Sequence, residues 1–435
     1  MKKTLKDIYR TWKILSPFHG YLLLLAVLQL LIQAMAIGFG IINSHTLTSL
    51  SDKNFRAMPF ILGIMVILYV IEYIFDYIRD WVTTNKTDRQ IQQLLQEYSL
   101  KKILNLTISQ HIEDHSAIKQ VIISNGEMAI ENIITNILFT ILPAMGMFIF
   151  SVGTLFYYDI RLGLIGFIVS LIIFIWVYRF AGYRQPFIEK NQAMWRENQK
   201  IRTEVFSHLP LVKYQAQEEL FTKKYISNRL EKVKYSIMVS NMGTRHRAKK
   251  DAFTTISQIT SVFYTIFLYI SGAISLGTIY LVWNINSRLY WQLSSMSTVF
   301  RQLPTLFVDL NNYFNAVDRE PIFNEKGNKK IISGDIIFTN VSFSYPKSES
   351  PVYTGVSFKI PYGKRTAFVG SSGGGKSTII KLLMRAYDYT SGSITLGGGD
   401  LRTLDTYTLR HKIGYVEQHV DLLDESIKEN ILFGV

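Results

Sequence analysis

Long apolar runs separated by polar stretches fill the chain up to Arg301. Six runs approach the ~20 residues that cross the hydrocarbon core of a bilayer as a helix. They are Gly20–Ile42, Pro59–Ile78, Ile133–Tyr157, Leu162–Tyr178, Ile256–Ile274 and Gly277–Leu293. The sixth is the weakest, because Asn284, Asn286, Ser287 and Arg288 interrupt it. The pattern predicts a membrane-embedded, all-α bundle of six helices.

The polar stretches alternate in length. Runs one and two, three and four, and five and six are joined by short links, whereas long segments follow runs two and four. In residues 84–131 and 185–250 apolar residues recur at helical spacing, as at Ile91, Leu94 and Tyr98. We therefore expect helices that extend beyond the membrane. Two soluble helical domains are the alternative, but neither segment is apolar enough for a core of its own.

After Arg301 the pattern changes. A helical stretch to Val317 and a polar connector, 318–330, lead into short β-type runs with glycine-rich turns. These runs are Ile336–Val341, Val356–Ile360, Thr366–Val369, Ser393–Leu396 and Ile413–Val416. The predicted organisation is a transmembrane domain at 1–317, a linker at 318–330 and a soluble α/β domain at 331–435.

Charge sets the predicted orientation. The net charge is +14, but the basic residues lie in blocks between apolar runs, which argues against a nucleic-acid-binding protein. The N-terminus and both long segments carry these blocks, so the positive-inside bias places them in the cytoplasm. The first run is too long for a signal-peptide core and lacks a small-residue cleavage site. The absence of cysteine excludes disulfide frameworks and thiolate metal sites.

The strongest chemical signal is a phosphate-loop motif. It consists of Gly370, Ser371, Ser372, Gly373, Gly374, Gly375, Lys376, Ser377 and Thr378. A β-type run precedes it and a helical stretch, Thr378–Arg385, follows, which disfavours a chance glycine turn. In this motif backbone amides surround phosphate oxygens, Lys376 reaches the β- and γ-phosphates, and Ser377 binds Mg²⁺. The motif predicts ATP and Mg²⁺ as cofactors, with Thr378 supporting the turn.

Other stretches around this loop resemble the motifs of one protein family, and they occur in the order that is typical of that family. In four stretches the chain resembles an exporter-type ABC half-transporter. They are Phe338–Pro346, Leu409–Gln418, Ser426–Ile431 and, in the membrane part, Leu211–Glu219. The fold class that follows is a membrane six-helix bundle with long cytosolic extensions, followed by a partial α/β P-loop nucleotide-binding domain.

The resemblance implies roles for individual residues. Tyr345 corresponds to the aromatic residue that stacks on adenine. Gln418 corresponds to the Q-loop residue that contacts Mg²⁺ or the attacking water, a catalytic role, although Glu417 replaces a proline that is common in the family. Two short coupling helices are expected, one within about 111–123 and one near Leu211–Glu219.

The chain departs from the family pattern at Val435. In the family the signature motif, the Walker B aspartate, the catalytic glutamate and the switch histidine come later. We therefore expect nucleotide binding without hydrolysis at a family-like rate, and enzyme activity stays undecided. The alternative to an exporter is a truncated, non-hydrolysing membrane fragment that at most binds nucleotide or a partner half.

Polar residues within the apolar runs are candidates for substrate contact. Arg288 would lie ~16 Å deep in the sixth run, where ionisable groups usually face a cavity or a partner such as Glu72. The alternative is that the bounds of the sixth run are wrong and that Arg288 lies in a more hydrated region. Hydroxyls of the fifth run would bond to neighbouring helices. These are Thr254, Thr255, Ser257, Thr260, Ser261 and Thr265, and the nearby aromatic candidates are Trp283, Tyr290 and Trp291.

The resemblance implies an ATP-driven exporter of a small molecule, lipid or peptide. Its partners would be a second half-transporter, identical or different, and the lipid bilayer, with no nucleic acid. We expect a multi-pass protein of a bacterial plasma membrane, with the N-terminus and the ATP-binding domain in the cytoplasm.

Overall fold

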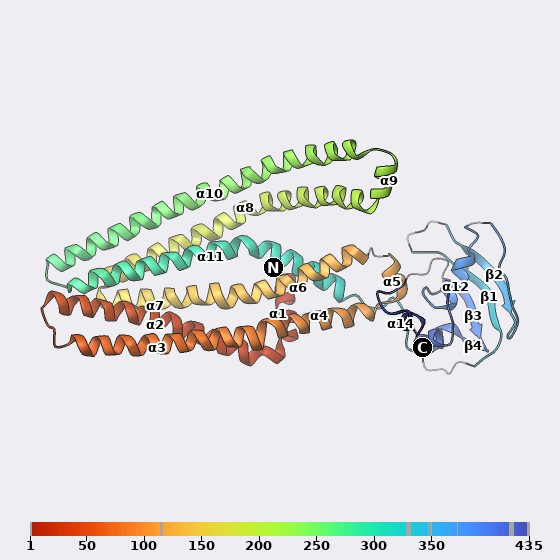
Figure 1. Ribbon diagram of the computed structural model, residues 1–435, viewed down its shortest axis with the longest axis horizontal. Helices are drawn as coiled ribbons and strands as arrows, with labels where there is room; N and C mark the ends of the chain where they lie inside the picture. Colours follow the sequence, from red (N-terminus) through yellow and green to blue (C-terminus); the bar gives the residue numbers. More distant parts are fainter. Residues whose placement is uncertain are drawn as a thin grey trace. The chain divides into compact units, whose positions relative to one another are not determined.

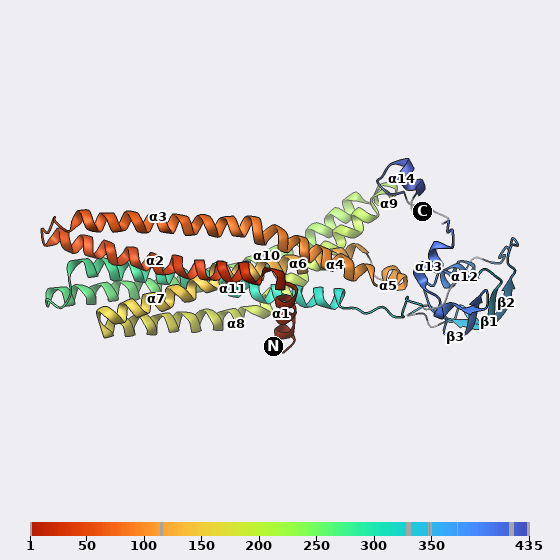
Figure 2. The ribbon, with the colours of Figure 1, turned by 90° about the horizontal axis from the view of Figure 1, so that it is seen from below.

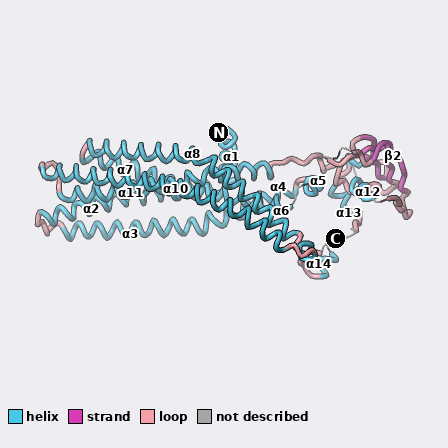
Figure 3. Tube along the Cα trace, turned by 90° about the horizontal axis from the view of Figure 1, so that it is seen from above, coloured by secondary structure: helices cyan, strands magenta, loops and turns pink. Residues whose placement is uncertain are grey.

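The computed structural model describes residues 2–113, 116–327, 332–346, 348, 350–371, 373–416 and 422–432. The chain forms two compact units (Figure 1). Unit 1 comprises Met1–Gln96 and Asn125–Tyr313, and unit 2 comprises Glu97–Ser124 and Phe314–Val435. Long helices make up unit 1, whereas the strands that the structure describes all lie in unit 2 (Figure 3).

Unit 1 is a bundle of long helices joined by short turns (Figure 2). Its elements are α1 (Lys2–Ile14), α2 (His19–Ser51), α3 (Met58–Val82), α7 (Leu142–Tyr158), α8 (Ile160–Ser207), α9 (Leu209–Tyr214), α10 (Glu218–Ile270) and most of α11 (Leu276–Val317). Two further helices, α4 (Arg89–Leu104) and α6 (Ser116–Asn136), run from unit 1 into unit 2. The segments after the second and fourth runs are therefore largely helical, as predicted.

Among the described residues, five helical stretches are long and apolar enough to cross a membrane. They are Ser16–Ser51, Met58–Leu104, Lys119–Tyr158, Ile160–Ser207 and Glu218–Ile270. These stretches overlap the first five predicted spans. The sixth predicted span also forms a helix, α11, but it falls short of the same apolar composition.

The polar character of α11 follows from its place in the bundle. Leu281, Ile285 and Leu289 are fully buried, and they pack among apolar residues of α2, α7, α8 and α10. Asn286 is also buried. A helix that buries one face against several other helices can carry polar residues such as Asn286 there, because polar side chains inside a bundle find protein surroundings.

Unit 2 contains a four-stranded antiparallel sheet in the order β2–β1–β3–β4. The strands are β1 (Ile336–Phe343), β2 (Tyr353–Ile360), β3 (Ser391–Leu396) and β4 (Gly399–Asp400). Three predicted β-type runs, those beginning at Ile336, Val356 and Ser393, are confirmed as strands. The sheet packs against α12 (Lys376–Leu383) and α13 (Thr406–His411), and Phe338, Leu382 and Leu409 lie in the shared core.

Two predicted strands are wrong. Thr366–Val369 and Ile413–Val416 have no strand pairing in the structure, and the side chains of Val369 and Val416 are 91 % and 86 % exposed. Their composition suits a buried strand, but a strand forms only when a neighbour supplies the ladder of hydrogen bonds. No strand within the described ranges pairs with either run, although the ring of Phe368 packs against that of Phe358 in β2.

The short helix α5 (Ile108–Glu113) is anchored within unit 2. Ile108 packs against the core of that unit, and the Gln110 side-chain amide donates to the carbonyl oxygen of Glu320 at 3.0 Å. The first coupling helix was expected within about 111–123, whereas this short helix begins at Ile108 and most of the expected range belongs to α6. Residues 114 and 115, inside the expected range, lie outside the described residues.

Candidate nucleotide-binding site

The phosphate-loop motif forms a glycine-rich turn that leads directly into α12. Gly373 and Gly375 have φ values of +81° and +84°, in the left-handed region that favours glycine. Gly375 is the N-cap residue of α12, and no side chain caps this helix. The first turn therefore presents backbone N–H groups and the positive end of the helix dipole toward the loop.

The Lys376 ammonium group is held at the loop. It donates to the carbonyl oxygens of Gly370 at 3.0 Å and Ser371 at 2.6 Å. No carboxylate in the described part of the chain forms an ion pair with it. The loop thus carries a positive charge satisfied only by neutral carbonyl groups, and such a charge forms a stronger bond with an anionic oxygen.

The two hydroxyl residues after Lys376 have different surroundings. Ser377 is exposed, and its hydroxyl has no hydrogen-bond partner in the described ranges. Thr378 is buried, and its Oγ1 lies 2.9 Å from the hydroxyl of Tyr345. Ser377 is therefore free to bind a ligand, whereas Thr378 ties the helix start to the loop after β1.

The structure brings Tyr345 to the loop, although the two lie far apart in sequence. Its ring makes edge contacts with Phe343 and Tyr387, with centroid distances of 5.0 and 5.1 Å. The ammonium group of Lys381 on α12 lies 5.5 Å from the ring centroid. Tyr345 is thus fixed by its hydroxyl and its ring contacts, and it lies beside the start of α12.

The motif contains no signal for a further residue of this site, Tyr353. The hydroxyl of this tyrosine, the first residue of β2, donates to the carbonyl oxygen of Gly375. A Cβ atom at position 375 would lie 2.7 Å from that hydroxyl oxygen, so the two residues are in close contact. Burial, followed by the charge of Tyr345, raises the pKa of Tyr353. Tyr353 therefore remains a neutral hydrogen-bond donor that supports the loop.

Two predicted site residues, Ser372 and Gln418, lie outside the described residues, as does Glu417. The structure gives the position of the other predicted residues from Gly370 to Thr378 and of Tyr345.

In the bundle, Arg288 is exposed and donates from Nε to the side-chain oxygen of Asn284 at 3.1 Å. Its charge interacts with that of Glu72 on α3, the partner considered from the sequence. Of the three aromatic candidates, Tyr290 is buried, whereas Trp283 and Trp291 are exposed. Among the described residues no ion pair joins Arg288 to Glu72, and the printed partner of Arg288 is Asn284 of its own helix.

The hydroxyls of the fifth run were expected to bond to neighbouring helices, and this is wrong for five of the six. Thr254 donates to the carbonyl oxygen three residues earlier in α10. Ser257, Thr260, Ser261 and Thr265 donate to carbonyl oxygens four residues earlier. A hydroxyl in a helix has this acceptor within reach at every position, so it needs no partner helix.

Comparison with known families gives two matches along the chain. Residues 22–289, more than half of the chain, match the family described as ABC transporter transmembrane region. Residues 353–432 match the family described as ABC transporter. The second match begins at Tyr353 and contains the phosphate loop.

Similar curated proteins include transporters of several kinds. ABC transporter B family member 6 of Dictyostelium discoideum is 26% identical over 359 residues, covering 76% of this chain and 52% of that protein. The mitochondrial iron-sulfur clusters transporter ATM1 of Debaryomyces hansenii is 28% identical over 349 residues, covering 76% and 49%. A putative multidrug export ATP-binding/permease protein of Staphylococcus aureus is 29% identical over 404 residues, covering 91% and 68%. The chain thus spans about half the length of the first two relatives.

Among solved structures, a bacterial Atm1-family ABC exporter with ATP bound is similar in fold. The TM-score is 0.81 at 20% identity, over 96% of this chain and 74% of that chain. This likeness extends over both units and supports the same succession of helices and sheet.

Proposed function

The chain belongs to the ABC transporters, and from this premise we propose that it is half of a dimeric exporter driven by ATP. The observation that carries the proposal is the phosphate loop. Its lysine has only neutral partners, its helix start is uncapped, and it belongs to the same chain as helices long and apolar enough to cross a membrane. Such a chain can couple nucleotide binding to movement of a membrane bundle.

The residues of the loop fit a nucleotide with its magnesium ion. Lys376 would move from its two carbonyl partners to phosphate oxygens, because a charge-assisted bond is stronger than a bond to a neutral carbonyl. The unpartnered hydroxyl of Ser377 would bind Mg²⁺, and Tyr345 would stack on the base. Gln418 would contact the ion or the attacking water. When bound, ATP and Mg²⁺ supply the free energy of phosphoryl transfer.

The predicted domain boundaries, 1–317, 318–330 and 331–435, are part of this proposal. In it the bundle lies in a bacterial plasma membrane, with the N-terminus and the soluble domain in the cytoplasm. The supporting observation is the concentration of Lys and Arg in the N-terminus and in the segments after the second and fourth spans.

A second half-transporter is the proposed partner, and the two short helices between the long ones support it. α5 packs within unit 2 through Ile108, whereas in α9 Leu209, Leu211 and Tyr214 are exposed. Exposed apolar residues on a short helix between two long ones are suited to contact another protein. We assign them to the partner, whether it is identical or different.

Within the bundle we propose that Arg288 contacts the exported substrate, a small molecule, lipid or peptide. It is exposed, and it lies in the helix whose buried residues pack among those of α2, α7, α8 and α10. An Arg288→Ala variant would keep ATP binding and lose export. Unchanged substrate selectivity in that variant would remove Arg288 from the site.

The test of the proposed function is ATP binding by the purified 435-residue chain. Replacing Lys376 by Ala removes a charged hydrogen-bond donor, whose contribution of about 1.5–3 kcal/mol corresponds to at least a tenfold loss of affinity. The matched control is Lys364→Ala, which removes an exposed lysine outside the loop. The measurement is titration with a fluorescent ATP analogue with and without Mg²⁺.

Loss of affinity in Lys376→Ala alone supports the proposal. Equal binding by the two variants, or an unmodified chain without affinity for ATP, contradicts it. ATP-dependent uptake into inside-out vesicles then tests export by the reconstituted pair of halves.

A further inference from the structure

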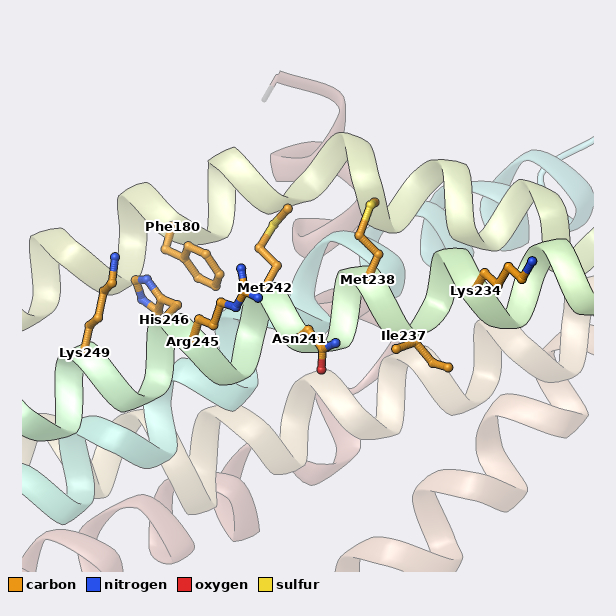
Figure 4. A pocket seen from close by; sticks show the side chains of 9 residues that line it. All are labelled: Phe180, Lys234, Ile237, Met238, Asn241, Met242, Arg245, His246 and Lys249. Atoms are coloured by element: carbon orange, nitrogen blue, oxygen red, sulfur yellow. The ribbon is translucent and has the colours of Figure 1, made fainter.

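A surface pocket of about 590 Å³ lies on unit 1 along α10, with α8 beside it (Figure 4). Its lining residues are Phe180, Lys234, Ile237, Met238, Asn241, Met242, Arg245, His246 and Lys249. Phe180 comes from α8, and the others come from four successive turns of α10. The pocket shares no residue with the phosphate loop, with Arg288 or with Glu72.

The pocket combines apolar side chains with positive charge. Phe180, Ile237 and the two methionines, Met238 and Met242, provide apolar surface. Lys234, Arg245 and Lys249 extend from α10 around them (Figure 4). No carboxylate in the described part of the chain forms an ion pair with any of the three. Three uncompensated cations beside apolar side chains favour a ligand that has both an acidic group and an apolar body.

His246 adds a hydrogen-bond donor without an acceptor. Its ring stacks on Phe180, with centroids 3.4 Å apart and planes at 7°, and its Nδ1 lies 3.3 Å from Nε1 of Trp176. Because an indole nitrogen only donates, Nδ1 accepts, and the proton of the neutral ring is on Nε2. Nε2 is buried and has no hydrogen-bond partner in the described ranges. A buried N–H group of this kind normally has an acceptor.

The level of the pocket relative to the membrane fits such a ligand. Phe180 follows the end of the fourth predicted span, Tyr178, by two residues, or ~3 Å along a helix. Stacking places His246 at the same level. In the orientation proposed above, this level is the boundary between the hydrocarbon core and the cytoplasmic headgroups, where lipid phosphates and amphipathic solutes gather.

We propose that this pocket binds an amphipathic organic anion by its acidic group. Arg245 and Lys249 bind the carboxylate or phosphate oxygens, and Phe180 and Met242 contact the adjoining apolar carbons. The anion is either a phospholipid of the cytoplasmic leaflet or a dissolved amphiphile on its way through the exporter. This ligand class rests on the proposed function as an exporter and adds to it. Because the anion binds in the absence of nucleotide, the anion site and the ATP site can each be disproved without the other.

The test uses the full chain in nanodiscs of phosphatidylcholine, without ATP, and dodecyl phosphate as the probe. Calorimetric titration should show saturable binding of dodecyl phosphate and none of uncharged dodecanol. The pair Arg245→Gln and Lys249→Gln should weaken binding at least tenfold. The matched control, Lys223→Gln with Arg229→Gln, removes the same charge from the same helix outside the pocket and should bind as the unmodified chain does.

A charge-conserving pair, Arg245→Lys with Lys249→Arg, separates recognition from folding. It should keep the affinity within about threefold, or ~0.7 kcal/mol at 1.4 kcal/mol per tenfold. The proposal is overturned if the unmodified chain does not bind dodecyl phosphate, if dodecanol binds equally, or if the control pair loses as much affinity as the pocket pair.

A second arm identifies the source of the anion. In nanodiscs that contain phosphatidylglycerol, a lipid occupant would compete, and the apparent affinity for dodecyl phosphate would fall at least tenfold in the unmodified chain. If the pocket instead takes up a dissolved amphiphile, that affinity stays the same in both membranes. Both results support an acidic-group site and assign it to one source.

Discussion

The two flanks of the phosphate loop are held very differently. On the C-terminal side, α12 is anchored, because Ile379 and Leu382 are buried in the core of unit 2 and Thr378 bonds to Tyr345. On the N-terminal side, Thr366–Val369 has no strand pairing and Val369 is exposed, so that Phe368, partly buried against the core, is the contact this run makes with it. The loop is thus positioned mainly from its C-terminal side. Its ability to bind phosphate should depend on α12 and β2 far more than on the run that precedes it.

The largest expected effect comes from removing the anchor itself. Leu382→Ala should lower the free energy of unfolding of unit 2 by about 2–5 kcal/mol, because it leaves a cavity in the core. Val369→Ala, on the exposed flank, should change it by no more than about 0.5 kcal/mol. Hydrogen exchange of the unit 2 amides in the full chain measures both. Comparable losses in the two variants would mean that the flanks are equally anchored.

The next effect tests the contact between the loop and β2. Gly375→Ala places a side chain at a left-handed residue, which costs about 1–2 kcal/mol, and against the ring of Tyr353 as well. Gly398→Ala is the matched control, since its φ is +83° but nothing lies within 4 Å of the added carbon. The first variant should lose more stability than the second and should also lose ATP affinity. Equal behaviour of both would show that Tyr353 does not constrain the loop.

A smaller effect is expected for the hydroxyl of Tyr353. Tyr353→Phe removes the hydrogen bond to Gly375 and should lower the free energy of unfolding by about 0.5–1.5 kcal/mol. The cost is at the low end because the Gly375 carbonyl also accepts from the backbone N–H groups of Thr378 and Ile379. Tyr362→Phe, which changes an exposed ring, serves as the control in the same unfolding experiment. A larger loss in the control would be inconsistent with the loop contact.

The smallest expected effect is the pH dependence of the stability of unit 2, which arises from hydrogen bonds to two exposed aspartates. The hydrogen bond from Lys359 and the Tyr362 N–H group hold the pKa of Asp335 below its usual value, and the Thr408 hydroxyl and N–H group do so for Asp405. A lowered pKa contributes stability that is complete above the unfolded-state value of ~3.9 and is lost as pH falls through the folded-state value.

Unit 2 should therefore lose stability as acid is added below about pH 4. Replacing Asp335 and Asp405 by Asn should flatten this dependence, whereas Asp424→Asn, which changes another exposed carboxylate of the unit, should leave it unchanged. Thermal unfolding at a series of pH values provides the measurement. An unaltered pH profile in the double variant would remove these two groups as its cause.

The helices could be predicted from the sequence because a helix satisfies its own backbone hydrogen bonds. The spacing at Ile91, Leu94 and Tyr98 was sufficient for α4, and long apolar runs were sufficient for the first five spans. Strands depend on neighbours that composition does not reveal. Ile336–Val341 and Thr366–Val369 look alike in sequence, but only the first has strands on both sides.

Part of the candidate site was equally predictable. The loop motif identified Lys376 and Ser377 because phosphate binding requires contiguous residues. Tyr353 was missed, since its contact with Gly375 depends on how β2 packs and not on any local pattern. The pocket around His246 was missed for the same reason, because Phe180 and His246 meet only when α8 and α10 pair.

The comparatively polar composition of α11 has a consequence for how the protein is made. A helix too polar to enter the bilayer by itself needs earlier helices to receive it, so α11 should insert together with α10, to which a short turn joins it, after the other spans are in place. Each crossing reverses the side on which the following chain emerges. The insertion of this single helix during synthesis therefore determines the compartment into which the nucleotide-binding sheet is delivered.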